Sequence, residues 1–173
     1  NAGFAKFCSY DDISIDESIN MIDLNISGVV AMGLVCIPHM KKGSHILNIA
    51  SQASFQPLPY QNIYSSTKAF VRNYTRALNV ELREKGITAT AVCPGWIKTE
   101  FFSHAIHDNT VSYFNRYYGP KEVIEKAVKD MHRNKPVSIL GLPERLQVLG
   151  VKLLPTRFVL KTWCKQQKKP FKY

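Results

Sequence analysis

The sequence predicts an α/β domain in which helices cover a parallel β-sheet. Two short apolar runs, residues 45–50 and 87–92, have the length and composition of buried strands. Longer segments with the apolar periodicity of helices alternate with them. A third helix at about residues 121–133 and a third strand at 136–140 continue this alternation. Because strand–helix alternation with strands this short indicates parallel pairing, we expect a layered α/β fold.

The first helix is predicted to begin after Ser14, because residues 14–17 have the S-x-x-E form of a capping box. Apolar residues then recur at helical spacing from Ile15 to Ile37. We therefore expect a long and mostly buried helix. Asn25 lies in its middle, and Asn is a poor helix former. Its side chain should have a partner, either on the backbone of the same helix or elsewhere.

The next elements follow in order. The first strand ends at Ser51, and after a loop with two prolines the second helix covers residues 62–85, with Gly86 as its C-cap. The second strand ends in a Cys-Pro-Gly sequence at residues 93–95. In parallel sheets ligands bind beyond the carboxyl ends of the strands, so Ser51 and the Pro-Gly turn are expected at one functional edge.

The composition is that of a soluble globular protein of one-domain size, with 173 residues, 45% hydrophobic and 21% charged. No uninterrupted apolar run reaches the roughly 18 residues that span a bilayer. The four cysteines form no CxxC pair. This pattern favours structural thiols in a reducing, cytoplasmic location, and we predict no metal site.

The formal net charge of +10 is concentrated at the C-terminus. Residues 151–173 contain seven Lys and Arg residues and no acid, which leaves +3 for the first 150 residues. The charge of the main domain is therefore ordinary, and nucleic acid is not an expected partner.

The strongest chemical pattern is the pair Tyr64 and Lys68, with Ser51 upstream. Residues four apart on a helix project from one face. A neighbouring ammonium favours the phenolate, so we expect Lys68 to lower the pKa of Tyr64 from about 10 towards neutrality. Tyr64 would then serve as a general acid or base, and Ser51 would hold a substrate oxygen. The alternative is a helix with a half-buried Tyr and a solvated Lys.

These motifs together resemble the classical short-chain dehydrogenase/reductase family. The resemblance covers residues 1–143. Asn25, Ser51, Tyr64 and Lys68 fall where the family has its Asn-Ser-Tyr-Lys tetrad. The opening Asn1-Ala2-Gly3 resembles the end of the family's NNAG turn, and residues 94–101 are similar to its nicotinamide loop.

The resemblance implies a Rossmann-like doubly wound sheet and a hydride transfer between NAD(P) and a carbonyl or secondary alcohol. NADP is favoured over NAD. Tyr64 would be the acid in reduction and the base in oxidation, Lys68 would hold the nicotinamide ribose, and Ser51 would orient the substrate. Asn25 would link Lys68 to solvent through its helix backbone and a water. The cofactor would also contact residues of the opening turn and the nicotinamide loop: Asn1, Ala2, Gly3, Pro94, Gly95, Ile97 and Thr99.

The sequence departs from the family in one large respect, because no Gly-rich phosphate loop occurs in it. We therefore expect only the catalytic half of the dinucleotide fold at residues 1–150, followed by a basic amphipathic extension at 151–173. This half would leave a sheet edge and a helix face uncovered. The resemblance further implies a homo-oligomer formed through the helices that carry Asn25 and Tyr64.

Two segments around the predicted site allow alternative interpretations. Residues 101–118 are rich in aromatic side chains, which indicates either a lid over an apolar substrate or packing against the core. His104 and His107 within this segment have a spacing open to metal, but no further ligand is placed nearby and surface histidines are favoured. Residues 151–173 either pack as a C-terminal helix with solvated lysines, which we favour, or contact an anionic membrane surface.

Three functions remain in view. The first is an oxidoreductase acting on a hydrophobic, lipid-like or steroid-like substrate. The second is a truncated, non-catalytic member of the same family that cannot hold the dinucleotide. A binder of nucleic acid or membrane surfaces ranks last.

Overall fold

The computed structural model describes residues 2–101, 105 and 110–172. Its central element is a three-stranded parallel sheet in the order β1 (His45–Ile49), β2 (Thr88–Val92) and β5 (Val137–Ser138). A shorter parallel pair joins β3 (Trp96–Ile97) to β4 (Tyr117–Tyr118). The α/β fold with a parallel sheet is therefore confirmed. It corresponds to one half of a Rossmann-like doubly wound sheet.

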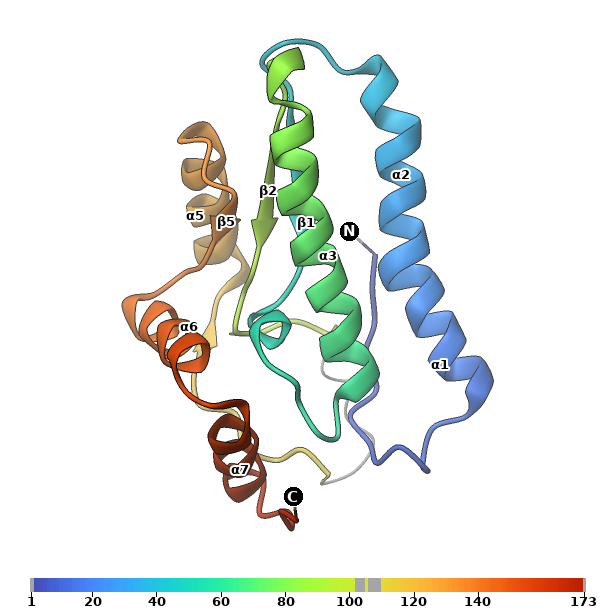
Figure 1. Ribbon diagram of the computed structural model, residues 1–173, viewed down its shortest axis with the longest axis vertical. Helices are drawn as coiled ribbons and strands as arrows, with labels where there is room; N and C mark the ends of the chain where they lie inside the picture. The colour runs from blue at the N-terminus through green and yellow to red at the C-terminus, as the bar shows by residue number, and fades with distance from the viewer. Residues whose placement is uncertain (1, 102–104, 106–109, 173) are drawn as a thin grey trace.

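Helices cover both faces of this sheet (Figure 1). Along β2 the side chains alternate between the faces, so that Ala91 packs in one cluster with Val71 of α3 (Asn62–Glu81). The next residue, Val92, packs with Val123 and Ala127 of α5 (Pro120–His132). The sheet therefore lies between α3 and α5, as a crossover topology requires.

The first helical stretch begins as predicted and then differs from the prediction. The Glu17 amide donates to Ser14 Oγ at 3.2 Å, which confirms the cap of α1 (Ile15–Ile22). A π-helical segment, η1 (Asp23–Ser27), joins α1 to α2 (Gly28–Cys36), and a short 3-10 turn, η2 (Ile37–His39), ends the stretch.

The expectation that this helix is mostly buried is wrong. No residue of α2 is buried, and Met32, Leu34 and Val35 are 62–66% exposed. The reason is that the stretch packs on α3 and on the opening segment of the chain through a narrow face that includes the buried Met21 and Asn25. Apolar residues on its other sides, such as Ile15 and Ile19, are exposed. Within the described residues no strand pairs with the outer edge of β1, whose residues are only half-buried.

This stretch also corrects the expectation that no segment is apolar enough to cross a bilayer. By length and composition alone Ile15–His39 passes that test, with a mean hydropathy of 1.8 over its best window and 11% of the window buried. The window tolerates polar residues such as Asp23 and Asn25, which interrupt any continuous apolar run. In this structure the stretch is a layer of the domain, because Asn25 is hydrogen-bonded to Thr67 of α3.

The later elements lie close to their predicted positions. The long helix α3 ends at Glu81, and a 3-10 turn, η4 (Arg83–Lys85), leads to Gly86, whose φ of 66° is the left-handed conformation expected of a C-cap glycine. A second 3-10 turn, η3 (Gln52–Phe55), follows β1. Two helices, α6 (Leu142–Leu153) and α7 (Thr156–Gln166), form the C-terminal part, and α6 runs through residue 150.

Candidate active site

Tyr64 and Lys68 lie one turn apart at the start of α3, and each is only 8% exposed. The ammonium Nζ of Lys68 lies 5.8 Å from the centre of the Tyr64 ring. It donates a hydrogen bond of 2.9 Å to the carbonyl oxygen of Ile49, the last residue of β1. The end of the first strand therefore anchors the lysine beside the tyrosine.

Ser51 reaches the same place from the loop that follows β1. Its Oγ accepts a hydrogen bond from the Ala53 amide at 3.1 Å, which caps η3 and fixes the side chain. The Ser51 hydroxyl also acts on the Tyr64 phenol, where it favours a lower pKa. The structure thus brings together the three groups that the sequence placed 13 and four residues apart.

The expected lowering of the Tyr64 pKa by Lys68 is wrong in this structure. Burial raises the pKa of Tyr64 to about 12, and the Ser51 hydroxyl only partly offsets this effect. Burial also lowers the pKa of Lys68 to about 8. Desolvation dominates both shifts because both side chains are buried, and the lysine ammonium donates to the Ile49 carbonyl.

Asn25 lies next to this group and contacts Thr67, the residue before Lys68. It lies in the π-helical segment η1 and is 1% exposed. Its side chain accepts from the Phe4 amide at 3.1 Å and donates to the Phe4 carbonyl at 3.0 Å and to Thr67 Oγ1 at 3.1 Å. The partner of Asn25 is therefore not its own helix. The irregular π-turn, a feature often found at functional sites, directs this amide between the opening segment and α3.

The opening segment is consequently held against Lys68. A side chain at Gly3 would place its Cβ 2.8 Å from Asn25 Oδ1 and 3.5 Å from Lys68 Nζ, so only glycine fits this approach. Ala2 is exposed and does not line the cavity described below, and Asn1 lies outside the described residues.

The loop after β2 forms the opposite wall. The Pro94 carbonyl accepts from the Gln52 amide at 2.8 Å, which ties this loop to the turn that carries Ser51. The Lys98 amide donates to the Tyr118 carbonyl at 3.0 Å and extends the β3–β4 pair. Gly95 approaches Gln52 so closely that a Cβ there would lie 2.9 Å from Oε1.

These walls enclose a cavity of about 610 Å³. Eight of the predicted site residues line it: Gly3, Ser51, Tyr64, Lys68, Pro94, Gly95, Ile97 and Thr99. Asn25 does not line it. The rest of the wall is largely apolar, and much of it comes from α6, α7 and the turn between them, including Val148, Leu154 and Val159.

An aromatic cluster that the sequence did not reveal packs around Tyr64. Phe7 is 1% exposed, and its ring meets those of Tyr64, Trp96 and Phe101 edge-on at centroid distances of 5.9, 6.2 and 6.5 Å. The spacing of Phe4 and Phe7 after the glycine turn was the available signal. Without the fold this pair could not be assigned to a particular core.

The described part of the aromatic segment, residues 101, 105 and 110–118, packs against the core and borders the cavity, and a lid over the substrate stays a prediction. Phe101 and Tyr113 line the cavity, whereas Phe114 packs on Trp96 with ring centres 4.8 Å apart. Phe102, His104 and His107 lie outside the described residues. In the part of the chain that the structure describes, no cluster of three or more His, Cys, Asp or Glu side chains could hold a metal ion.

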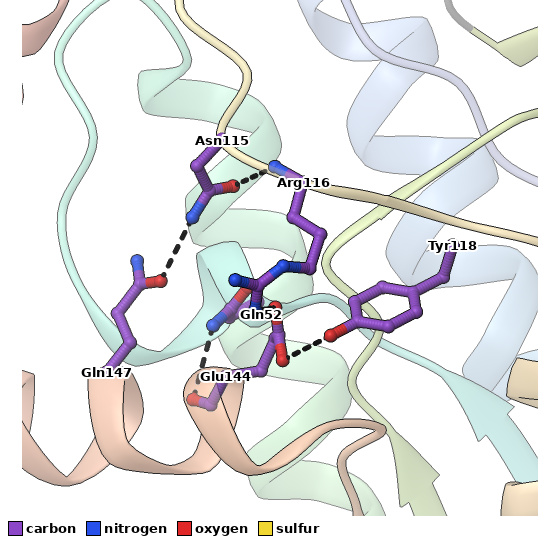
Figure 2. Close-up of polar contacts among 6 residues, drawn as sticks. All are labelled: Gln52, Asn115, Arg116, Tyr118, Glu144 and Gln147. Atoms are coloured by element: carbon purple, nitrogen blue, oxygen red, sulfur yellow. Dashed lines mark hydrogen bonds and ion pairs between the residues drawn. The ribbon is translucent and has the colours of Figure 1, made fainter.

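A polar cluster joins α6 to this segment, and the sequence reasoning missed it (Figure 2). Glu144 is 4% exposed and accepts from the Tyr118 hydroxyl at 2.6 Å and from Arg116 at 3.3 Å. Gln52 Nε2 donates a hydrogen bond of 3.3 Å to the backbone carbonyl of Glu144. On the side of the cavity, Asn115 donates to Gln147 at 3.4 Å. The cluster thus fixes α6 against the turn that carries Ser51.

The C-terminal helix α7 packs on the domain with its apolar side. Val159 and Trp163 are 7% exposed, and Trp163 Nε1 donates to the Pro59 carbonyl at 2.9 Å. The Lys169 ammonium lies over the Tyr60 ring. This is the packed arrangement that the sequence favoured for the extension.

Comparison with known proteins identifies the family. A short chain dehydrogenase family model matches residues 1–110, which is more than half of the chain. The chain belongs to the short-chain dehydrogenase family. It is 42% identical over 85 residues to 17-beta-hydroxysteroid dehydrogenase type 3 of Mus musculus. This match covers 48% of this chain and 28% of that protein. It is 38% identical over 101 residues to an uncharacterized oxidoreductase of Staphylococcus aureus (strain USA300), covering 57% of this chain and 44% of the relative.

Solved structures agree with this assignment. A short-chain dehydrogenase from Sphingobium yanoikuyae in complex with NADPH superposes with a TM-score of 0.74 at 28% identity, covering 86% of this chain and 59% of that one. A 3-ketoacyl-(acyl-carrier-protein) reductase from Brucella melitensis complexed with NADH gives a TM-score of 0.69 at 26% identity, with 82% and 63% covered. The chain therefore spans less than half of the length of the curated relatives and about three-fifths of these solved chains.

Proposed function

We propose that this chain carries the catalytic residues of an NAD(P)-dependent oxidoreductase that interconverts a carbonyl and a secondary alcohol. The observation that carries the proposal is the meeting of Ser51, Tyr64 and Lys68, each at most 9% exposed, on the wall of one largely apolar cavity. Proton donors buried beside apolar walls are the arrangement that general acid–base catalysis uses.

The residues present fit the nicotinamide end of such a cofactor. Of the three N–H donors of the Lys68 ammonium, the described residues engage one, at Ile49. The others are free to hold ribose hydroxyls, and Gly3 leaves room beside them. Pro94, Gly95, Ile97 and Thr99 would border the nicotinamide from the opposite wall. When bound, the dinucleotide supplies the hydride.

The chain's own residues supply the proton that the substrate oxygen receives. With a pKa of about 12, Tyr64 is a neutral phenol at neutral pH, ready to donate its proton to a carbonyl oxygen as that oxygen gains charge. Ser51 donates a second hydrogen bond to the same oxygen. Lys68 is charged below its pKa of about 8 and stabilises the phenolate that forms. Asn25 holds the opening segment so that Lys68 stays in place.

The proposed substrate is hydrophobic, lipid-like or steroid-like. The part of the cavity formed by α6 and α7 offers Val148, Val151, Leu154, Phe158 and Val159 to it. The name of the mouse relative, a hydroxysteroid dehydrogenase, agrees with this class. NADP as the preferred form of the cofactor remains our prediction, to be decided by competition between NADPH and NADH.

We also propose a homo-oligomer formed through the face of α2 and α3. This proposal is supported by the exposure of Met32, Leu34 and Val35 on α2 and of Phe70 and Val80 on α3. Sedimentation of the chain and of a Met32→Lys variant tests it, since the charge should shift an oligomer towards monomer.

The proposed activity is tested by Tyr64→Phe. This change removes the proton donor and leaves the ring, so turnover of a hydrophobic ketone with NADPH should fall by about 10²- to 10⁴-fold while dinucleotide binding persists. The control is Tyr60→Phe, because Tyr60 lies four residues upstream and does not line the cavity. Near-normal turnover of Tyr64→Phe would contradict the role of Tyr64. Failure of the chain itself to bind any dinucleotide would instead support the non-catalytic alternative.

A further inference from the structure

A second cavity, of about 460 Å³, lies between α3, the strand β5 and α6. Among its described lining residues, cations greatly outnumber acids. Arg72 and Arg76 of α3, Lys135 before β5, and Arg145 and Lys152 of α6 are cations, and Asp130 is the one acid among the described lining residues. This cavity is separate from the proposed catalytic one and does not contain any of the residues placed in the catalytic machinery above.

The acid does not neutralise this cavity because it is already engaged. Asp130 forms ion pairs with Lys126 and Lys135 and accepts from Ser138 Oγ at 2.8 Å. Burial opposes its ionisation, but these contacts outweigh burial and hold the pKa of Asp130 below its ordinary value. Asp130 therefore balances Lys126 and Lys135, and the four remaining cations have no carboxylate left in the cavity.

These four cations are also without ion-pair partners elsewhere among the described residues: Arg72, Arg76, Arg145 and Lys152. The contacts recorded for the guanidinium groups go to neutral groups. Arg145 Nε donates to the Ile139 carbonyl at 3.1 Å, and Arg72 Nη2 donates to Asn73 Oδ1 at 3.2 Å. Arg72 Nε is buried without a hydrogen-bond partner in the described structure. The cavity therefore holds unused donors and uncompensated positive charge.

The ring of Phe55 keeps two of these cations together. The Arg72 guanidinium carbon lies 4.3 Å from the ring centre and the Lys152 ammonium 5.4 Å from it. Cation–π contact offsets part of the cost of placing like charges close together. The same ring also lines the catalytic cavity, so Phe55 forms a wall between the two sites. The basic cavity is therefore a built feature that crosses three elements.

We propose that this basic cavity binds a phosphate group. Guanidinium forks match the geometry of phosphate oxygens and donate to two of them at once, and a lysine adds a point charge. A phosphate with up to two negative charges neutralises more of the four cations than a carboxylate does. The proposal goes beyond the proposed oxidoreductase function and does not depend on it.

The outer face of α6 indicates where such a phosphate could come from. Leu142, Leu146, Leu149 and Leu153 recur at helical spacing and are 51–75% exposed. At about 100° per residue, Arg145 and Lys152 lie between this leucine stripe and the packed side of the helix. Apolar side chains flanked by cations suit the boundary of an anionic bilayer. The phosphate can thus belong to a lipid headgroup or to a soluble phosphate ester, and the experiment separates the two.

The test compares the chain with Arg76→Gln/Arg145→Gln, since both arginines are exposed and neither lines the catalytic cavity. The matched control is Arg83→Gln, an exposed arginine in the turn η4 that follows α3, outside both cavities. Thermal unfolding is followed in inorganic phosphate and in chloride at equal ionic strength. Phosphate should raise the unfolding temperature of the chain and of the control above its value in chloride. The double variant should lose this difference.

A second arm identifies the source of the phosphate. The same three proteins are sedimented with vesicles of phosphatidylcholine, with and without phosphatidic acid. Binding that needs phosphatidic acid and is lost in the double variant assigns the site to a lipid headgroup, and phosphate-dependent stabilisation without vesicle binding assigns it to a soluble ester. An equal phosphate effect in the double variant and the chain, or no effect beyond that of chloride, overturns the proposal. Neither arm measures turnover, so the outcome is independent of the oxidoreductase activity.

Discussion

The two cavities share the ring of Phe55, but they differ in the burial and the bonding of their polar side chains. In the candidate catalytic cavity, Ser51, Tyr64 and Lys68 are buried, and hydrogen bonds fix the side chains of Ser51 and Lys68. In the basic cavity, Arg76, Arg145 and Lys152 are exposed and unpaired within the described structure.

This difference separates two kinds of function. Buried, partnered groups are preorganised, so their chemistry is coupled to the stability of the fold. Exposed cations contribute little to stability and are available to a ligand from outside. Substitutions near the catalytic cavity should therefore change the free energy of unfolding, whereas those in the basic cavity should change binding alone.

The largest expected effect is that of Phe7→Ala. Phe7 is 1% exposed and contacts the rings of Tyr64, Trp96 and Phe101, so its removal leaves a void beside Tyr64. The free energy of unfolding should fall by about 3–5 kcal/mol. Urea titration measures this loss. Phe70→Ala is the control, because Phe70 is 40% exposed and should cost far less. Equal losses for both variants would show that the aromatic cluster is not a core.

The second prediction concerns the buried charge of Lys68. Its pKa is about 8 in the folded chain and 10.5 in the unfolded one, so between these values the unfolded chain binds more protons. The wild-type chain should therefore gain stability as pH rises through this window. Relative to Lys68→Met, the gain should be about 3 kcal/mol, from 1.36 kcal/mol per pKa unit.

The measurement for Lys68 is urea unfolding of both proteins at several pH values from below 8 to 10.5. The raised pKa of Tyr64 acts in the opposite direction above pH 10, but it is common to both proteins and cancels in the comparison. A pH-independent difference between them would mean that Lys68 is solvated rather than buried.

A smaller effect is expected for Glu144→Ala. The carboxylate accepts hydrogen bonds from the Tyr118 hydroxyl and from Arg116, and Tyr118 is left with an unused donor when the carboxylate is removed. We expect a loss of about 2–3 kcal/mol, as for a buried hydrogen-bonded charge. Chemical denaturation measures it, with Glu125→Ala of the exposed pair to Lys121 as the control. If both substitutions cost the same, the polar cluster in Figure 2 does not fix α6.

The elements of the fold were predictable because their signals are local. The cap at Ser14, the strand β2 and the left-handed Gly86 each depend on a few adjacent residues, and the structure confirms them. The burial of α2 was not predictable in this way. Apolar residues occur on every side of that helix, and which side is covered depends on how the tertiary structure places it against Val71 and Tyr74 of α3.

The candidate site shows the same limit. Motif spacing placed Ser51, Tyr64 and Lys68 at one sheet edge, and the structure brings them together there. The pKa of Tyr64 is raised by burial and is not lowered by the nearby lysine, and part of this burial comes from Phe7, a residue far away in the sequence. Glu144 was missed because a charged residue in the first turn of a helix usually faces water.

The smallest expected effect is that of Arg76→Gln/Arg145→Gln on stability without phosphate. Neither arginine forms an ion pair with a described residue, and the one recorded side-chain bond of Arg145, to the Ile139 carbonyl, can be replaced by the Gln amide or by water. The variant should unfold within about 0.5 kcal/mol of the wild type. Relief of repulsion should make it slightly more stable at low salt, and the difference should disappear as salt screens the charges. Urea titration at two salt concentrations, with Arg83→Gln beside it, measures both effects. A loss comparable to that of Glu144→Ala would mean that these cations hold the fold together, and the contrast between the two cavities would then fail.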